Sequence, residues 1–280
     1  MKIPFWKMHG AGNDFILLNR ACRNPPAYPS SEEIRAWCRP HTGIGADGLI
    51  LVEPPDAPEI HFRMVFFNPD GGEAAMCGNG ARCVARLAFE QGIAPSNMCF
   101  GTGSGHMHAT VKETSVTLDM QLPASISLGQ QLALGSDDVI QYDFADTGVP
   151  HVVVVCPDVA SINLPRLGKA IREHANFSPD GTNVDFIQIL SDGALRIRTY
   201  ERGVEAETLA CGTGVAAAAL TAVLNGRTPS PVHVHTAGGD TLVITVKHDA
   251  GHISSLQLTG PAQHVFQGHI TDNPLQHERS

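Results

Sequence analysis

Short apolar runs rich in β-branched and aromatic residues recur along the chain, and clusters of Gly, Pro and Asp separate them. Runs bounded in this way predict β-strands. The predicted strands include Phe15–Leu18, Gly48–Val52, His61–Phe67, Val116–Met120, His151–Val155, Asp185–Leu190, Leu195–Tyr200, Val232–Thr236 and Thr241–Val246. Helical patterns are fewer: they occur at Ser31–Cys38, at Leu164–His174 and after Cys77 and Cys211. Because strands and helices do not alternate regularly, the pattern predicts a mixed α/β (α+β) fold rather than a doubly wound parallel sheet.

The two helices predicted after Cys77 and Cys211 differ from ordinary surface helices. The segment Val215–Val223 contains no charged residue. The segment Ala81–Phe89 is similarly apolar but carries two arginines. Because a helix that is apolar on every side is buried on every side, we expect both helices to be enclosed by other elements.

An internal repeat relates the two halves of the chain. When Cys77 is aligned with Cys211, Cys-Gly-Asn-Gly lies over Cys-Gly-Thr-Gly, and a glycine follows 15 residues later in both halves, at Gly92 and Gly226. A weaker similarity links Gly12–Ile16 with Thr182–Ile187. Chance similarity between two glycine-rich turns is the alternative, and it explains the shared spacing less well. The repeat therefore predicts two pseudo-symmetric lobes with an active site in the cleft between them.

We place the lobe boundary in the Pro- and Ser-containing stretch Leu122–Ser136. The expected N-terminal lobe comprises residues 1–122 joined by the C-terminal segment 265–280, and the expected C-terminal lobe comprises residues 123–264.

Composition and charge narrow the classes of function. Hydrophobic residues make up 42% and charged residues 17% of the 280 positions, which is typical of a folded chain. The formal net charge is −9 and no basic run is present, so no nucleic-acid or membrane partner is expected. No apolar stretch is long enough to span a bilayer, and the N-terminus lacks a signal-peptide core, so we expect a cytoplasmic protein. Seven cysteines without a CxxC pair predict reduced thiols and no metal site.

Each Cys-Gly-x-Gly motif places a sulfur near the N-terminus of a predicted helix. The helix dipole and the unpaired N–H groups at such an end stabilise a thiolate and bind a carboxylate. Two thiols on opposite sides of one carbon atom can invert a stereocentre, because one removes a proton from one face while the other delivers a proton to the opposite face. Cys77 and Cys211 are therefore candidates for an acid/base pair.

Long segments of the chain resemble the diaminopimelate epimerase family. The matching segments are Lys7–Phe15, Asn68–Arg82, Gly148–His151, Gly181–Phe186 and Tyr200–Gly214. The resemblance implies an isomerase that interconverts LL-2,6-diaminopimelate and meso-diaminopimelate, without pyridoxal phosphate, in lysine and peptidoglycan precursor synthesis. It also implies two lobes, each a strand-rich, barrel-like sheet wrapped around a central apolar helix. The expected partner is a small-molecule substrate, with a homodimer as a possible assembly and no cofactor.

The resemblance assigns roles to particular residues. Cys77 and Cys211 would exchange protons with the substrate, and His151 and Glu201 would lie near the thiols and tune their proton affinity. The remaining residues would bind substrate. Gly78, Asn79, Gly212 and Thr213 would hold the reacting carboxylate, and Asn13, Asn68, Asn183 and Arg202, with Glu201, would contact the rest of the molecule.

Two positions depart from the family's pattern, and other readings remain open. Many members carry Asn at the position of Val149 and Gln at that of Gly48. Asp14 and Asp185 are interpreted as turn caps rather than bases. The alternatives are another pyridoxal-phosphate-independent racemase acting on proline, hydroxyproline or a basic amino acid, a binding protein on the same scaffold, and a cysteine hydrolase that pairs one thiol with a histidine.

Overall fold

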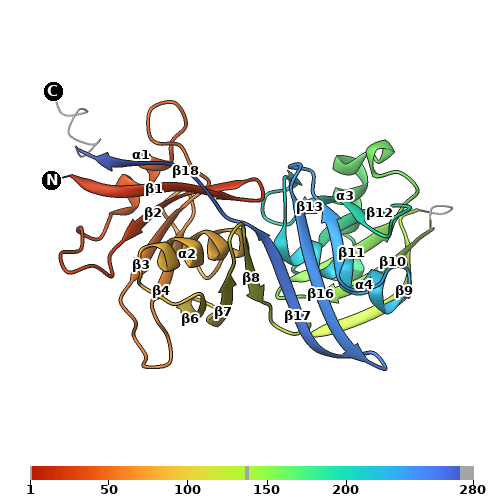
Figure 1. Ribbon diagram of the computed structural model, residues 1–280. Helices are drawn as coiled ribbons and strands as arrows, with labels where there is room; N and C mark the ends of the chain where they lie inside the picture. Colours follow the sequence, from red (N-terminus) through yellow and green to blue (C-terminus); the bar gives the residue numbers. More distant parts are fainter. Residues whose placement is uncertain (1, 136–138, 272–280) are drawn as a thin grey trace. The chain divides into compact units, whose positions relative to one another are not determined.

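The computed structural model describes residues 2–135 and 139–271 (Figure 1). Two compact units divide the chain. Unit 1 comprises the residues up to Leu118 together with the segment that begins at Gly260, and unit 2 comprises Asp119–Thr259.

Unit 1 is built from strands that surround one helix. Its elements are β1 (Ile3–Gly10), β2 (Asn13–Asn19), α1 (Ser31–Cys38), β3 (Leu49–Glu53), β4 (Arg63–Phe67), β5 (Glu73–Ala74), α2 (Gly78–Glu90), β6 (Asn97–Thr102), β7 (Gly105–Val111), β8 (Ser115–Asp119) and β18 (Gln263–Ile270). Strand β1 pairs antiparallel with both β2 and β18, and β2 pairs parallel with β3. Strand β3 pairs antiparallel with β4, and β4 pairs parallel with β6. Strand β6 pairs antiparallel with β7, and β7 pairs antiparallel with β8.

The central strands of unit 1 are buried on both faces. Phe15 and Leu17 pack in the core that contains the residues of α2, whereas the alternating Ile16 and Leu18 pack with Ile34 and Trp37 of α1. Successive side chains of a strand point to opposite faces. Because one helix covers each face, these strands have continuous apolar runs instead of alternating polar and apolar positions.

Unit 2 has the same general construction. Its elements are β9 (Ser125–Ala133), β10 (Val139–Asp146), β11 (Pro150–Val155), a 3-10 turn (Val159–Ser161), α3 (Leu164–Arg172), a second 3-10 turn (Ala175–Phe177), β12 (Asn183–Ile189), β13 (Leu195–Glu201), β14 (Ala206–Thr208), α4 (Gly212–Leu224), β15 (Val232–His235), β16 (Thr241–Asp249) and β17 (His252–Pro261). Strand β10 pairs antiparallel with both β9 and β11. Strand β11 pairs parallel with β12, and β12 pairs antiparallel with β13. Helix α4 contacts β10–β13, β15 and β16, and α3 packs on β12 and β13 (Figure 1).

The repeat inferred from the sequence is present in the local structure. Helices α2 and α4 both contain 13 residues, and each follows a cysteine N-cap with extended backbone. Each is followed by a glycine with positive φ, +68° at Gly92 and +67° at Gly226. The predicted fold class, a mixed α/β fold in which strands surround a central apolar helix in each unit, is confirmed.

The stretch in which we placed the lobe boundary contains a strand. Strand β9 occupies Ser125–Ala133, inside the stretch where we placed the boundary. The contact-defined units divide instead between Leu118 and Asp119 and again between Thr259 and Gly260. Residues 1, 136–138 and 272–280 of the segments named in the sequence analysis lie outside the described residues.

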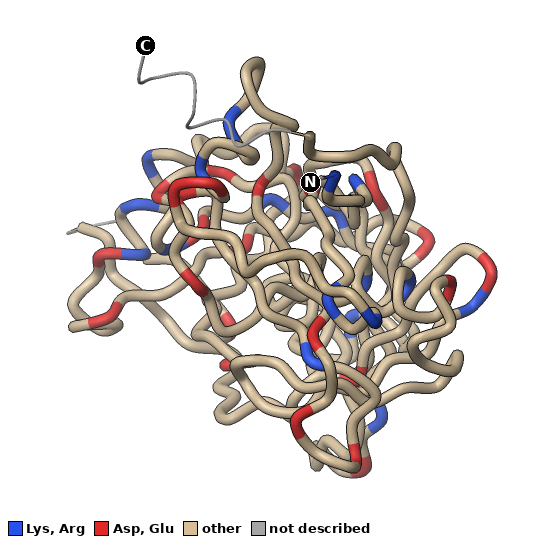
Figure 2. Tube along the Cα trace, turned by 90° about the vertical axis from the view of Figure 1, so that its left-hand side faces the viewer, with Lys and Arg blue, Asp and Glu red and all other residues tan. Residues whose placement is uncertain are grey.

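Charged side chains are distributed along both units. Figure 2 shows Lys and Arg positions interspersed with Asp and Glu positions along the trace. Among the described residues, no helix combines the length and the apolar character needed to cross a membrane.

Candidate functional site

Cys77 lies at the N-cap of α2, where its backbone is extended (φ −139°, ψ 118°) and its side chain is half-buried. Asn79 is the second residue of the helix, and its side chain is almost fully buried. Its Nδ2 donates a hydrogen bond of 2.7 Å to Oδ1 of Asn13, which begins strand β2. Two residues predicted to bind substrate therefore contact each other at the helix end that carries the thiol.

A buried arginine fixes the orientation of the Asn79 amide. Arg82 has no exposed surface, and its guanidinium donates to Asn79 Oδ1 at 2.8 Å and to the Pro261 carbonyl at 3.2 Å. The Asn13 Nδ2 group donates in turn to Asp47 Oδ2 at 3.1 Å. The chain Arg82–Asn79–Asn13–Asp47 thus holds both amides in one orientation.

Asn68 lies apart from this network, in the turn between β4 and β5, and is exposed. Its N–H donates to the Gly72 carbonyl at 2.9 Å, and the Gly71 N–H donates to the Asn68 carbonyl at 2.9 Å. The backbone of Asn68 therefore closes this turn.

Cys83 is on the same helix as Cys77 but differs from it in environment. It is fully buried, and burial raises the pKa of its thiol to about 12. A thiol in this state stays protonated at neutral pH and is unreactive. Cys83 is a core residue.

Cys211 occupies the corresponding N-cap position of α4 in unit 2 (φ −113°, ψ 111°) and is half-buried. Its Sγ lies 3.4 Å from the hydroxyl oxygen of Thr213. The same hydroxyl lies 2.9 Å from Nε2 of His151 in β11. Three of the predicted site residues are therefore connected through one hydroxyl group.

The structure adds a residue that the sequence analysis interpreted wrongly. Asp185 was expected to cap a turn, but it lies inside β12 and is fully buried. Its Oδ2 is 2.7 Å from Nδ1 of His151, and its Oδ1 accepts a hydrogen bond of 2.6 Å from the Thr199 hydroxyl. Asp14, in contrast, is partly exposed. It accepts the backbone N–H of Asp47 at 3.0 Å.

The Asp185 carboxylate determines the charge of His151. Burial alone lowers the pKa of a histidine, but the charge and hydrogen bond of Asp185 outweigh that effect and raise the pKa of His151 to about 10, with a smaller contribution from Cys211. At neutral pH the ring is therefore an imidazolium that faces Thr213 and Cys211.

Asn183 and Arg202 form a second group in unit 2. Asn183 begins β12 beside His151, with which it is in register in the parallel pair β11–β12. Its Oδ1 accepts the Arg202 N–H at 2.8 Å, and its Nδ2 donates to the Pro150 carbonyl at 3.1 Å. Glu201 precedes Arg202 at the end of β13 and is half-buried. The structure thus gathers His151, Asn183, Glu201 and Arg202 at neighbouring strand ends.

A loop after β13 is held by residues that the sequence analysis did not single out. Glu205 has a positive φ of +58°, which is unusual for a residue with a side chain. Its N–H donates to the Glu201 carbonyl at 2.8 Å, and its carboxylate accepts from Gly203 N–H and Arg172 Nε, each at 3.0 Å. These bonds fix the backbone that presents Glu201 and Arg202.

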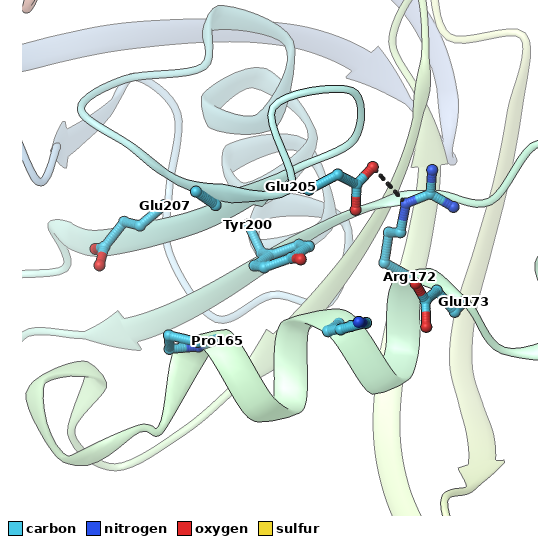
Figure 3. Close-up of a pocket in the computed structure, with 8 residues that line it drawn as sticks. Pro165, Arg172, Glu173, Tyr200, Glu205 and Glu207 are labelled. Carbon is cyan, nitrogen blue, oxygen red and sulfur yellow. Dashed lines mark hydrogen bonds and ion pairs between the residues drawn. The ribbon is translucent and has the colours of Figure 1, made fainter.

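Glu205 also forms one wall of a pocket of about 490 Å³ between α3 and strands β13 and β14. Figure 3 shows Arg172 and Glu205 meeting beside this pocket, with the Tyr200 ring between Glu205 and helix α3. The lining residues are Pro165, Lys169, Arg172, Glu173, Tyr200, Glu205, Ala206 and Glu207. None of the predicted site residues lines it.

The structure gives a physical reason for one departure from the family pattern. A Cβ atom at Gly48 would lie 2.6 Å from Phe66 Cε2 and 2.6 Å from the Phe67 carbonyl oxygen. No side chain fits there while the Phe66 ring and the β4 backbone stay in place. Val149 lies in the turn before His151, next to Gly148, whose φ is +120°.

Within residues 2–135 and 139–271, no three His, Cys, Asp or Glu side chains are grouped as metal ligands. The chemistry available in the described site comes from thiols, an imidazolium, carboxylates and amides.

Comparisons with known proteins show the family of this chain. The family model described as diaminopimelate epimerase matches residues 5–124 and 144–265. Diaminopimelate epimerase of Aquifex aeolicus is 42% identical, covering 98% of this chain and 100% of the relative. The Bacteroides thetaiotaomicron enzyme of the same name is 40% identical, covering 96% and 98%. The crystal structure of a hydroxyproline epimerase from Agrobacterium vitis superposes with a TM-score of 0.69 at 20% identity, covering 98% of this chain and 94% of that one, which establishes a shared fold. The family match spans both cysteine-capped helices, and the chain belongs to the diaminopimelate epimerase family.

Proposed function

We propose that this protein is an isomerase that interconverts LL-2,6-diaminopimelate and meso-diaminopimelate by proton transfer at one Cα, without a cofactor. The observation that carries the proposal is the pair of cysteines, each at the N-cap of a buried 13-residue helix, in a chain of this family. In the reaction one thiolate removes the Cα proton, and the other thiol delivers a proton to the opposite face.

The two helix ends supply the electrostatic part of the mechanism. The first N–H groups of a helix have no partner within it and carry partial positive charge. The N–H groups at Gly78 and Asn79 and at Gly212 and Thr213 would bind the reacting carboxylate. They would also stabilise the negative charge that develops as the Cα proton leaves.

The remaining site residues would recognise the distal end of the substrate. Asn13, Asn68 and Asn183 each offer both a donor and an acceptor, which suits a zwitterion. The Arg202 guanidinium would bind the distal carboxylate through two parallel hydrogen bonds. Glu201 and His151 would adjust the proton affinity of the thiols, and Glu201 would also contact the substrate.

The proposal includes three expectations about the setting of the enzyme. It would act in the cytoplasm, on a free small molecule, and could do so as a homodimer. Fractionation of the producing cells and sedimentation of the purified protein test the first and last of these. The likeness to the hydroxyproline epimerase concerns the fold and does not favour that substrate.

Turnover in heavy water tests the mechanism. LL-diaminopimelate is incubated without pyridoxal phosphate, and deuterium at Cα is measured in product and in recovered substrate. We expect deuterium in the meso product and little in early recovered substrate, because the incoming proton comes from a thiol that exchanges with solvent. Product that keeps its original hydrogen would contradict the two-thiol mechanism. Rapid turnover of proline or hydroxyproline, without turnover of diaminopimelate, would favour the alternative substrate class.

Alanine variants test the same proposal at each thiol. Cys77→Ala and Cys211→Ala should each reduce kcat at least about a hundredfold, because one face then lacks its proton carrier. The matched controls are Cys83→Ala for Cys77 and Cys156→Ala for Cys211. Both control thiols are buried in the same units and are not part of the proposed site. Substantial epimerase activity in either site variant would disprove the assignment.

A further inference from the structure

Three side chains, Asp185, His151 and Thr213, connect the interior of unit 2 to the Cys211 thiol. Asp185 Oδ2 lies 2.7 Å from His151 Nδ1, and His151 Nε2 lies 2.9 Å from the Thr213 hydroxyl. That hydroxyl lies 3.4 Å from Cys211 Sγ. Asp185 and His151 have no exposed surface, so solvent does not reach the pair that they form.

Tight packing holds these groups in place. A Cβ atom on Gly214 would lie 2.6 Å from Asp185 Oδ1 and 3.1 Å from His151 Cε1, so the first turn of α4 rests directly on the ion pair. Hydrogen bonds fix the two ends. The Thr199 hydroxyl donates to Asp185 at 2.6 Å, and the Thr147 hydroxyl donates to the Thr213 carbonyl at 2.8 Å.

Among residues 2–135 and 139–271, two titratable groups act on the His151 ring. They are Asp185 from β12 and Cys211 from the start of α4. The neighbours of His151 in the sheet, Ala145 of β10 and Asn183 of β12, do not titrate, and neither does Thr199 of β13. The proton on Nε2 is therefore controlled by one carboxylate on one side and one thiol on the other.

The hydroxyl between His151 and Cys211 can carry a proton in either direction. With His151 protonated, Nε2–H donates to Thr213 Oγ1, and the Thr213 O–H donates to the Cys211 thiolate. With His151 neutral, the thiol donates to Oγ1, and the Thr213 O–H donates to Nε2. Moving between these states breaks one S–H bond, forms one N–H bond and exchanges the hydroxyl proton, so no proton is gained or lost.

We infer that Asp185 is a positioning residue and that Asp185, His151 and Thr213 form a proton relay serving Cys211. Asp185 holds the Nδ1 proton, which turns Nε2 toward Thr213, and its negative charge favours the imidazolium that accompanies a thiolate. The inference deepens the proposed function, on which it rests for the role of Cys211 in the reaction. The relay itself is a property of unit 2 and can be measured without substrate.

Alkylation of the thiols by iodoacetamide tests the relay. The full-length enzyme is alkylated across a range of pH, and the rates at Cys211 and Cys77 are measured separately by peptide mass spectrometry. In Asp185→Asn and Thr213→Val, we expect the rate at Cys211 near neutral pH to fall about tenfold, which corresponds to a displacement of its pH profile by about one unit. The rate at Cys77 in the same sample should not change.

Two further variants separate the relay from a general loss of structure. Thr213→Ser keeps the hydroxyl and should restore the Cys211 rate. Asp143→Asn removes another buried carboxylate of unit 2, which is bonded to Arg227 and Asn225, and should leave the Cys211 profile unchanged. If Asp185→Asn fails to fold, the Cys211 alkylation rates of Thr213→Val and Thr213→Ser still test whether the hydroxyl group is required.

An unchanged Cys211 profile in folded Asp185→Asn or Thr213→Val would overturn the relay. Equal loss in Asp143→Asn would also overturn it, because the effect would then be structural. An altered profile in a protein without diaminopimelate epimerase activity would leave the relay standing and disprove the proposed function. Normal epimerase activity with an unchanged Cys211 alkylation profile in the variants would support the proposed function and disprove the relay.

Discussion

His151 has an unusual environment for a residue that is charged at neutral pH. The ring is fully buried, and its charge is maintained mainly by the charge and hydrogen bond of Asp185, which is fully buried beside it. Breaking such a pair by removing one partner leaves an uncompensated charge in the interior. The effect of pH on this single residue should therefore appear in the stability of the protein.

We expect the stability advantage of the wild-type protein over Asp185→Asn to depend on pH. The pKa of His151 is raised from 6.5 to about 10 in the folded state. A raised pKa stabilises the fold fully below the unfolded-state value, and this contribution disappears as pH rises through the folded-state value. The difference in free energy of unfolding should thus narrow between about pH 6.5 and about pH 10. Urea unfolding of both proteins at each end of this range measures it, and a constant difference would contradict the assigned charge.

Motifs predicted several residues of the candidate site, but they did not predict which polar residues are buried. Cys77, Cys211, Thr213 and His151 were predicted from motifs, and the structure brings the last three together. Asp185 was misinterpreted because an aspartate near a glycine-rich segment usually caps a turn. Its burial depends on the parallel pairing of β11 and β12, which is a tertiary contact that the local sequence does not reveal.

At the scale of elements, helix α4 depends on a close approach that only glycine permits. Gly214 lies in its first turn, against Asp185 and His151. Alanine normally stabilises a helix relative to glycine by about 1 kcal/mol. At this position the added methyl group would meet a carboxylate oxygen at 2.6 Å.

We therefore expect Gly214→Ala to lower the free energy of unfolding by about 1–3 kcal/mol, the usual cost of overpacking. Gly212→Ala in the same helix is the matched control, because its Cβ would meet only Leu258 Cδ1 at an ordinary 3.5 Å. Thermal or urea unfolding compares the two variants. Equal stability would show that the start of α4 can move away from the ion pair.

The hydrophobic pattern predicted those helices and strands that lie in the hydrophobic cores of the two units. Helices α2 and α4 and the strands that pack on them carry long apolar runs, so their positions were predicted closely. Strand β18 is mostly exposed, and β5 and β14 contain two and three residues. Such strands are defined by their pairing partners rather than by their own side chains, and the pattern gives no signal for them.

At the scale of the whole molecule, the two cysteine-capped helices make the proposed reaction sensitive to oxidation. If both thiols serve one Cα, they can come within reach of a disulfide when no substrate is bound. We expect a mild oxidant to inactivate the enzyme by joining Cys77 to Cys211 and dithiothreitol to restore activity. Peptide mapping of the oxidised protein checks the bond. Inactivation with both thiols still free would rule it out.

The two-fold repeat was predicted from the sequence because glycine spacing and cysteine position survive in both halves. The limits of the units were harder to place, since a strand, β9, occupies the Pro- and Ser-containing stretch that resembles a linker. Its exposed positions carry Ser, Gln, Gly and Ala, and within this strand only Leu132 is fully buried. Composition alone does not distinguish such an edge strand from a loop.

Strand β1 acquires one of its neighbours long after β1 itself has been synthesised. Strand β1 pairs with β18 from Ile3 opposite Ile270 to His9 opposite Gln263. Ribosomes add roughly 5–20 residues per second, so this edge of β1 waits on the order of tens of seconds for its partner strand. All of unit 2 leaves the ribosome in that interval, since its residues are contiguous. The nascent chain therefore begins unit 1 before unit 2 and completes it after unit 2, and until then it exposes an open strand edge with which other chains can pair.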